Sequence, residues 1–348
     1  MSDFHISTGS MFSSARRAVV EIQKELAICQ KELSSGLRND IGLRLGGGFT
    51  SLDQMRQAQV WHDALEGSVT VGNLRLEICQ NAMTSIAASA QRFLDQLVGG
   101  KGAIADLASI GEAAKSSLSA LTNGLNSSVA GVFVFAGKNS ASPPLGDYLK
   151  AGSAASISMA GAFSAEFGLA PGDPGVLAIT PAQMSSFLDG AFDSEFSDPK
   201  WGANWSSATT EVNDLVVGDG DVVGLGATAN EGAFRKLAKA FVLVAEMASA
   251  NVNENTRGTI LDKAVELVSE GLRGLTALGS RVGNVQARIV ALHKATEGEG
   301  EILAMRVAQI QNADPFEVGT RLRELMTQLE ASYSISARMH QLSLVKFL

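Results

Sequence analysis

Aromatic residues are scarce in this sequence. They make up 6% of its 348 residues, with three tryptophans and two tyrosines. A compact enzyme core of this size would usually bury more large aromatic side chains. A chain rich in Ala, Ser, Leu and Gly instead suits long helices that pack closely along their length. The composition therefore favours helical packing over a compact enzyme core.

The sequence also has no excess of positive charge and no long apolar run. Its formal net charge is −8, whereas binding to the phosphates of a nucleic acid needs clustered lysines and arginines. It has no run of about 18 apolar residues, the length that a membrane helix needs. We therefore expect neither nucleic acid nor a membrane as a partner.

A cleavable secretory signal is missing from the start of the sequence as well. The first residues, Met1–Ile6, do not place a basic segment before an apolar one. Two locations stay open on this ground. One is the cytosol, and the other is reached by an export route that reads an uncleaved N-terminus.

Cysteine and histidine are too few and too scattered to form a recognisable site. Cys29 and Cys79 are the only cysteines, and neither lies in a CxxC or Cys/His cluster. We interpret both as small buried hydrophobic residues. The four histidines, which show no metal-ligand spacing, are His5, His62, His293 and His340. No nucleophile–base arrangement stands out, so the sequence predicts no catalytic residue, no metal site and no cofactor.

Near the N-terminus, apolar residues recur alternately three and four positions apart, the spacing of one buried helical face. A first stripe consists of Phe12, Ala15, Val19, Ile22, Leu26, Cys29 and Leu33. A second consists of Leu65, Val69, Gly72, Leu76, Cys79, Met83, Ile86, Ala90, Phe93 and Leu97. Glycine-containing breaks at 34–36, 46–48 and 99–102 bound these stripes. The pattern predicts a terminal helix, a long helix from Ser51 to Gly99 and a third helix over Ala103–Val129.

The same spacing returns in the C-terminal third. One stripe consists of Phe234, Leu237, Phe241 and Val244, and a longer one of Ala264, Val268, Gly271, Leu275, Leu278, Val282, Val285, Ile289 and Leu292. The final stripe holds Val318, Leu322, Leu325 and Leu329, then Ile335, Met339 and Leu342 in a shifted phase. Because the shift is too large for one unbroken heptad repeat, we expect the apolar face to drift around the last helix.

The middle of the chain differs in character. Residues 131–228 hold most of the prolines and many Gly, Ser and Asp residues. Three short apolar runs lie there between turn signals: Val132–Phe135, Val176–Ile179 and Leu215–Val217. Short apolar runs bounded by turns are typical of a small β-rich domain.

These elements predict a mainly α fold with a β-rich insertion, in which the N- and C-terminal segments form a long antiparallel helical bundle or coiled coil. We divide the chain into three parts. Terminal helices occupy 1–50 and 300–348, a long-helix bundle occupies 51–135 and 229–299, and a β-rich outer domain occupies 136–228. The terminal stripes have no evident partner within the chain, so we expect them to pack between subunits.

Several motifs resemble the bacterial flagellin family. Residues 31–38 (KELSSGLR) resemble the family's N-terminal signature, in which a leucine precedes Ser-Ser-Gly and a basic residue follows. Residues 278–289 (LGSRVGNVQARI) are similar to its long C-terminal helix, and residues 306–314 (RVAQIQNAD) resemble the break before its last helix. The resemblance covers roughly 1–140 and 230–348. Residues 39–48 depart from the family, because they are shortened and glycine-rich where flagellins continue Asp-rich.

Two further features resemble the branch of the family that joins the hook to the filament. The run Phe133–Asn139 (FVFAGKN), followed by Pro143 and Pro144, is similar to that branch's aromatic-glycine-proline motif. Residues 341–348 (QLSLVKFL) are similar to its C-terminal tail. Flagellins proper usually end differently, so the resemblance favours a junction protein that filament assembly and motility require.

By this resemblance the chain is a structural component of the flagellum and not an enzyme. The implied partners are other copies in a helical oligomer, the first hook-associated protein, flagellin and a flagellar export chaperone. The implied location is the extracellular hook–filament junction, reached by type III export without a cleaved signal peptide. The candidate subunit-interface residues are Phe12, Val19, Ile22, Leu26, Leu33, Leu322, Leu325, Leu329, Leu342, Leu344 and Leu348.

Two alternatives stay open. The chain could be flagellin itself, the bulk filament subunit, which shares the family motifs. It could also be a cytosolic helical enzyme or sensor, which should show polar groups converging in its bundle core.

Overall fold

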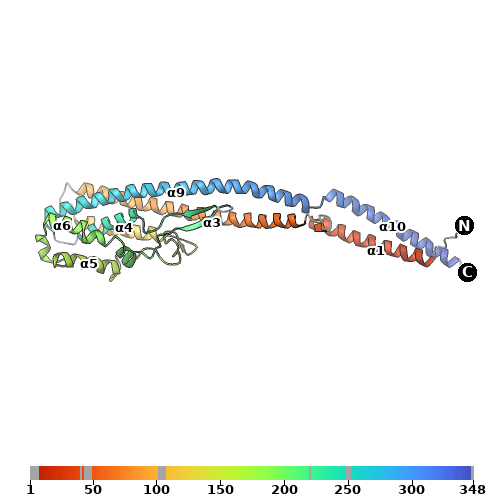
Figure 1. Cartoon of the computed structure of the whole chain (residues 1–348), viewed down its shortest axis with the longest axis horizontal. Coiled ribbons are helices and arrows are strands. Elements are labelled where there is room, and N and C mark those ends of the chain that lie inside the picture. Colours follow the sequence, from red (N-terminus) through yellow and green to blue (C-terminus); the bar gives the residue numbers. More distant parts are fainter. Residues whose placement is uncertain are drawn as a thin grey trace. The chain divides into compact units, whose positions relative to one another are not determined.

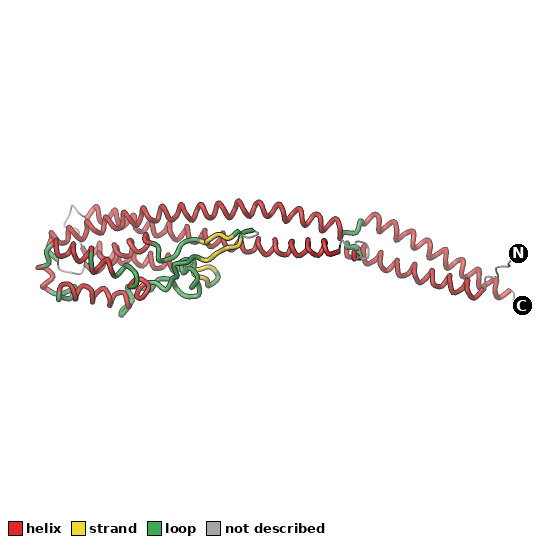
Figure 2. The backbone as a smooth tube through the Cα atoms, viewed as in Figure 1, coloured by secondary structure: helices red, strands yellow, loops and turns green. Residues whose placement is uncertain are grey.

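The computed structural model describes residues 8–39, 41–42, 49–100, 107–218, 221–247 and 252–345. Their contacts group into two units. Unit 1 comprises the described residues within 1–63 and 297–348, and unit 2 comprises those within 64–296. Helices supply most of the regular structure of both units (Figure 1, Figure 2), which confirms the mainly α fold class.

Unit 1 is built from helical segments of both ends of the chain. They are α1 (Thr8–Ser35), the start of α3 (Phe49–Gly100), the end of α9 (Glu254–Gln311) and α10 (Pro315–Val345). α1 and α10 run antiparallel side by side (Figure 1). The predicted breaks at 34–36 and 306–314 are where α1 ends and where α9 gives way to α10. The predicted break at 46–48 lies outside the described residues.

In unit 2, the remaining parts of α3 and α9 pack with α4 (Leu107–Leu125) and α8 (Gly232–Met247). The long stripe predicted on α3 is the core of this unit. Its buried members are Leu65, Val69, Leu76, Cys79, Met83, Ile86, Ala90, Phe93 and Leu97. α8 is buried along most of its length, because it packs between α4 and α9.

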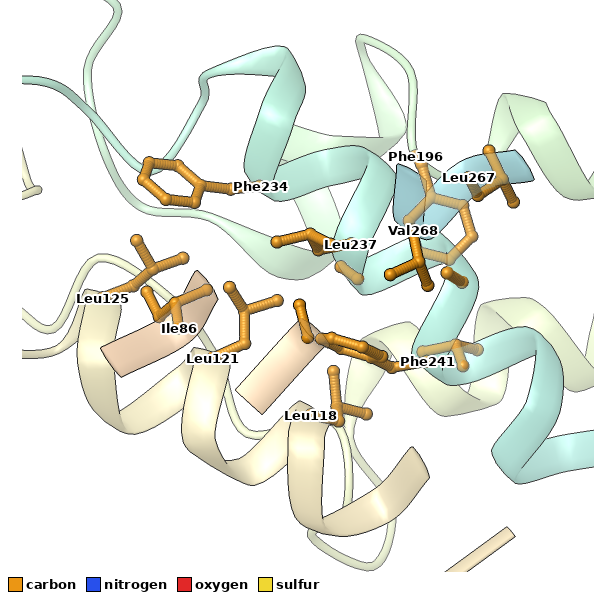
Figure 3. Close-up of a cluster of buried hydrophobic side chains, with 14 of the residues drawn as sticks. Ile86, Leu118, Leu121, Leu125, Phe196, Phe234, Leu237, Phe241, Leu267 and Val268 are labelled. Carbon is orange, nitrogen blue, oxygen red and sulfur yellow. The ribbon is translucent and has the colours of Figure 1, made fainter. Parts of the chain in front are cut away.

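Figure 3 shows the centre of this core, where α4 and α8 face each other. Leu118 and Leu121 of α4 point toward Phe241 and Leu237 of α8, and all four side chains are fully buried. Phe241 also meets Phe93 of α3 edge to face, with ring centroids 5.3 Å apart. Burial of each such side chain stabilises the fold by about 1.5–3 kcal/mol, so this contact fixes α8 within the bundle.

Between α4 and α8 the chain is more helical than its turn-rich composition predicts. The helices are α5 (Ala154–Phe167), α6 (Pro181–Asp189) and α7 (Ala191–Ser194), with a 3₁₀ turn η2 (Pro174–Ala178) and a π-helical turn η3 (Trp201–Trp205). The strands form two antiparallel pairs: β1 (Ser128–Val129) with β2 (Val132–Phe133), and β3 (Asn213–Val216) with β4 (Val222–Leu225).

The predicted strand runs show why the expectation of a β-rich segment differs from the structure. Val132–Phe135 and Leu215–Val217 contribute to strands, but Val176–Ile179 lies mainly in η2. Pro174 begins that turn and Pro181 begins α6, because the fixed φ of proline suits a first helical residue. An apolar run of four residues between turns fits either a strand or a helical turn. The regular structure of the segment is therefore mainly helical, with one hairpin of two four-residue strands.

The scarce aromatic residues gather in this middle segment. Neighbouring ring centroids lie between 4.8 and 6.5 Å apart in a cluster of Tyr148, Phe163, Phe167, Phe187, Phe192, Phe196, Trp201 and Trp205. The cluster belongs to the same hydrophobic core as the long helices of unit 2. The contacts thus divide the chain into two units, and residues 136–228 share a core with the bundle.

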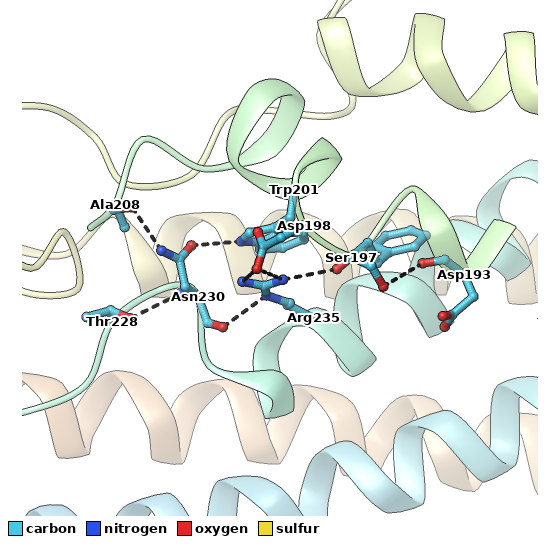
Figure 4. A network of polar contacts seen from close by, with 9 residues as sticks. Asp193, Ser197, Asp198, Trp201, Ala208, Thr228, Asn230 and Arg235 are labelled. Atoms are coloured by element: carbon cyan, nitrogen blue, oxygen red, sulfur yellow. Dashed lines mark hydrogen bonds and ion pairs between the residues drawn. The ribbon is translucent and has the colours of Figure 1, made fainter. Parts of the chain in front are cut away.

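A polar network holds this segment against α8 (Figure 4). The guanidinium of Arg235 donates two hydrogen bonds to Asp198 Oδ2, each 3.1 Å long. The same group lies over the ring of Trp201, 5.3 Å from its centroid. Trp201 Nε1 donates to Asn230 Oδ1 at 2.8 Å, and Asn230 Nδ2 donates to the carbonyl of Ala208 at 2.8 Å. Each polar side chain in this network therefore has a partner.

Candidate assembly surface

The α1–α10 pair in unit 1 is where most of the predicted interface residues lie. Its own small core consists of Cys29, Ala313, Val318 and Leu325, with Ile22, Leu26 and Leu322 packed against it. Gln23 Nε2 donates to the hydroxyl of Tyr333 at 2.9 Å, and Arg321 pairs with Glu25 at 3.3 Å. Exposed ion pairs contribute little, so apolar contacts provide most of the stability of the pair.

The two helices are also joined through their backbones where each one breaks. Gly36 follows α1 at φ +69°, the left-handed conformation that glycine adopts without strain. Ala313 N donates to Gly36 O at 2.9 Å, Arg38 N donates to Gln311 O at 2.8 Å, and Arg38 Nε donates to Asn312 O at 3.0 Å. We call this arrangement, Gly36–Arg38 with Gln311–Ala313, the paired break. It places the C-terminal end of α1 beside the N-terminal end of α10.

The terminal stripes have a partner within the chain, contrary to the expectation from sequence, because α1 and α10 pack against each other. Buried or partly buried in unit 1 are Val19, Ile22, Leu26, Leu322, Leu325 and Leu329. Leu33 is 47% exposed. The side chains of Phe12, Leu342 and Leu344, and all of Leu348, lie outside the described part of the chain. Periodicity reveals an apolar face but not which other face it meets, so this pairing could not be read from the stripes.

Past Leu329 the apolar face of α10 turns away from α1. The positions that stay partly covered continue the three–four alternation as Ser332 and Ser336. Tyr333 and Ile335, in contrast, are 50% and 57% exposed. Ile335, the first residue of the shifted stripe, therefore lies off the face that α1 covers, and the side chains of Met339 and Leu342 lie outside the described residues. Among the described side chains past Leu329, Ile335 is thus left exposed, and Tyr333 is half exposed while its hydroxyl accepts from Gln23 of α1.

Among the residues that the structure describes, unit 1 exposes more large hydrophobic side chains than it buries. The exposed ones are Val20, Leu33, Leu37, Val60, Trp61, Ile302, Met305, Phe316, Met326, Tyr333 and Ile335. The buried hydrophobic residues are Cys29, Leu52, Val307, Ala313, Val318 and Leu325. Exposed apolar side chains that adjoin one another are candidates for contact with another molecule. Phe316, the most exposed of them, escaped the sequence analysis because it lies outside the stripes.

The motif Phe133–Asn139 packs the start of the middle segment against α8. Phe135 is fully buried and meets Phe234 edge to face, with ring centroids 5.6 Å apart. Gly137 has φ +62°, and a Cβ there would lie 2.4 Å from the carbonyl oxygen of Glu211. Only glycine fits this position, so the motif has a packing role in unit 2.

Other kinds of site find little support in the described residues. No helix there combines the length and the apolarity that a bilayer span requires. No group of three His, Cys, Asp or Glu side chains in those ranges could hold a metal ion. Cys29 and Cys79 are free and buried, and burial raises the pKa of the Cys79 thiol to about 12. Both cysteines therefore serve as small hydrophobic residues, as predicted.

The two units together define a class of protein. Unit 2 buries the long stripes predicted from the sequence in its own core, whereas unit 1 pairs two terminal helices and leaves many large apolar side chains exposed. This combination is typical of a structural subunit that associates with further molecules through its terminal helices.

Family comparison identifies the class more closely. Residues 6–140 match the bacterial flagellin N-terminal helical region, and residues 265–348 match the bacterial flagellin C-terminal helical region. The chain belongs to the bacterial flagellin family, as its motifs predicted. It is accordingly a structural protein of the flagellum, outside the cell, in a family whose members assemble into helical polymers.

A solved structure from Vibrio parahaemolyticus, assigned by its description to the flagellar hook-associated proteins, has a similar fold. The two chains are 9% identical, and the match covers 76% of this chain and 97% of that chain with a TM-score of 0.51. At this identity the likeness concerns the fold alone. Comparison with curated proteins gave no match.

Proposed function

We propose that this chain is the subunit that joins the flagellar hook to the flagellin filament, with a structural and not an enzymatic role. The proposal rests on one contrast: unit 1 leaves large apolar side chains exposed, whereas unit 2 has an extensive core of its own. Such a chain can fold its body alone and still offer its terminal helices to neighbours.

The α1–α10 pair supplies the contacts between copies in this proposal. Leu33, Phe316, Tyr333 and Ile335 are exposed on it, and the stripe of α10 continues in sequence toward Leu342. Covering one such side chain contributes at most about 1.5–3 kcal/mol. Several of them together can offset the entropy lost when subunits associate. The candidate interface thus includes the exposed residues in addition to the predicted stripe residues.

Three features support a junction subunit over the filament subunit. The tail at 341–348 is similar to that of junction proteins, and so is the Phe133–Asn139 motif, whose Phe135 is buried in the core of unit 2. The fold is also similar over 97% of the Vibrio chain that is assigned to the hook-associated proteins. Flagellin itself is the second candidate, because matches to both flagellin helical regions fit it equally well.

The proposal names the neighbours of the chain. Further copies would complete a short helical zone, the first hook-associated protein would bind on the hook side, and flagellin would bind on the filament side. An export chaperone would hold the chain in the cytosol before type III export without a cleaved signal peptide. The exposed apolar side chains of unit 1 are surfaces that such a chaperone can cover by a helix-in-groove contact.

Immunogold labelling of isolated flagella tests the proposal. We expect label in one short zone between hook and filament, and few copies of the chain for each flagellin by quantitative mass spectrometry. Label along the whole filament, with the copy number of its main protein, would show that the chain is flagellin. Label confined to the cell body would contradict both candidates.

A further inference from the structure

α3 carries a second row of apolar residues, of which Ile78 packs against the core whereas Val71 and Leu74 lie outside it. In unit 2, Gly67, Val71, Leu74 and Ile78 follow one another at intervals of four, three and four residues, which places them on one side of the helix. Val71 is 55% exposed and Leu74 is 44% exposed. Isolated exposed hydrophobic residues are ordinary, whereas two neighbours on one helical face form a surface on which another element can pack.

An arginine without a partner lies beside this row. Arg75 is partly buried, and it makes no hydrogen bond or ion pair with any residue that the structure describes. Burial lowers the pKa of its guanidinium from the ordinary value. A partly desolvated charge without a counter-ion is costly. A carboxylate from another molecule would remove that cost. We call Val71, Leu74 and Arg75 the helix patch.

The β3–β4 hairpin presents a surface of the same kind with the opposite charge. Its inner side packs on α3, since Leu215 lies so close to Gly72 that a Cβ there would be 2.5 Å from Leu215 Cδ2. On its outer side, Val216 and Val222 pair across the strands and are 49% and 52% exposed. Asp214 lies on the same side of β3 as Val216.

The carboxylate of Asp214 is exposed and makes no hydrogen bond or ion pair with a described residue, although the charge of Lys138 acts on it. The nearby Lys138 pairs with Glu211 instead. We call Asp214, Val216 and Val222 the hairpin patch. The helix patch and the hairpin patch therefore match: each has two exposed branched apolar side chains and one charge that forms no ion pair with a described residue, and the charges have opposite signs.

We propose that the helix patch of one copy binds the hairpin patch of a second copy, with Arg75 paired to Asp214 and the valines covering Val71 and Leu74. The patches are different surfaces, so the contact is heterologous, and each copy keeps one patch of each kind for the next copy. Heterologous contacts are those that propagate a ring or a helical assembly. The inference rests on the proposed function only in that copies of this chain assemble with one another.

Charge reversal with rescue tests the contact. Arg75→Glu and Asp214→Arg are introduced singly and together into a strain that lacks its own copy of the gene, and filaments per cell are counted by electron microscopy. Each single change brings like charges together at the interface, which should lower filament number about tenfold or more. The double variant restores an opposite pair in reversed order, and filament number should recover most of the loss.

Controls separate this contact from effects on folding. Lys115→Glu reverses an exposed lysine on α4 whose ion pair is with its near neighbour Glu112, and it should leave filament number unchanged. Thermal unfolding of each purified variant should match that of the parent chain. If Arg75→Glu does not fold, Arg75→Gln with Asp214→Asn replaces it. The two neutral changes together should then lower filament number no further than either alone.

Two results would overturn the inference. Filament numbers like the parent's in both single variants would show that the patches are not buried in the assembly. A folded double variant as defective as the single ones would show that a different partner covers the patches. The proposed function is tested separately by immunogold labelling. If the double variant restores filament number but the label covers the whole filament, the contact is supported and the junction role is rejected. If the label lies at the junction but the double variant restores nothing, the junction role is supported and the contact is rejected.

Discussion

At Gly137, backbone conformation and close packing act on the same atom. Its φ of +62° strains any other residue, and an added Cβ would overlap the carbonyl oxygen of Glu211 at 2.4 Å. We expect Gly137→Ala to lower the free energy of unfolding of unit 2 by about 3 kcal/mol, measured by denaturant titration. Gly131→Ala is the matched control, because φ there is +81° but nothing lies within 4 Å of an added Cβ. It should cost about 1 kcal/mol, and equal losses would contradict tight packing at the motif.

The two cysteines give a second prediction at this scale. The thiolate is the reactive form of cysteine, and burial raises the pKa of both thiols, that of Cys79 to about 12. At pH 8 both are therefore neutral and shielded. We expect neither Cys29 nor Cys79 to react with a chromogenic disulfide reagent in the native protein, and both to react in guanidinium chloride. Rapid native reaction at one of them would show that its stripe opens.

For the terminal helices, one buried and one exposed residue of α10 separate folding from assembly. Leu325 lies in the small core shared with α1, so Leu325→Ala should destabilise the pair by about 2–3 kcal/mol. Hydrogen exchange of the α1 amides in the monomer should accelerate accordingly. Ile335→Ala removes an exposed side chain, so it should leave that exchange unchanged and lower filament number. Equal exchange rates in the two variants would contradict the assignment of Leu325 to the pair.

How far the sequence predicts this fold depends on the length of each pattern. α3 and α9 repeat the three–four spacing over many turns, and their predicted core residues such as Leu76 and Val282 are buried. The run Val176–Ile179 is too short to distinguish a strand from a helical turn. The pairing of α1 with α10 and the unpaired charge of Arg75 were not predictable. Both depend on which faces meet in space, and a single sequence does not show that.

On the scale of the whole molecule, the core of unit 2 and the tail that we propose for assembly belong to different parts of the chain. The described core of unit 2 is formed by residues between 64 and 296, and the last ten residues of the chain belong to unit 1. Deleting residues 339–348 should therefore leave the thermal unfolding of unit 2, followed by calorimetry, unchanged. The same deletion should abolish filament attachment, because it removes the predicted anchors Leu342, Leu344 and Leu348. Normal filaments on cells with the shortened chain would disprove the assembly role of this tail.

The paired break constrains how the gene can change length. Arg38 and Asn312 form a hydrogen bond although 274 positions separate them. This bond fixes the register in which α1 and α10 pack against each other. One codon gained or lost inside α1 would rotate every residue before it by about 100° relative to α10. A gain in one arm alone would also leave the other arm short. Inherited insertions should therefore come in whole heptads and in both α1 and α10 at once. The lengths of the two ends of the coding sequence should then change together during evolution.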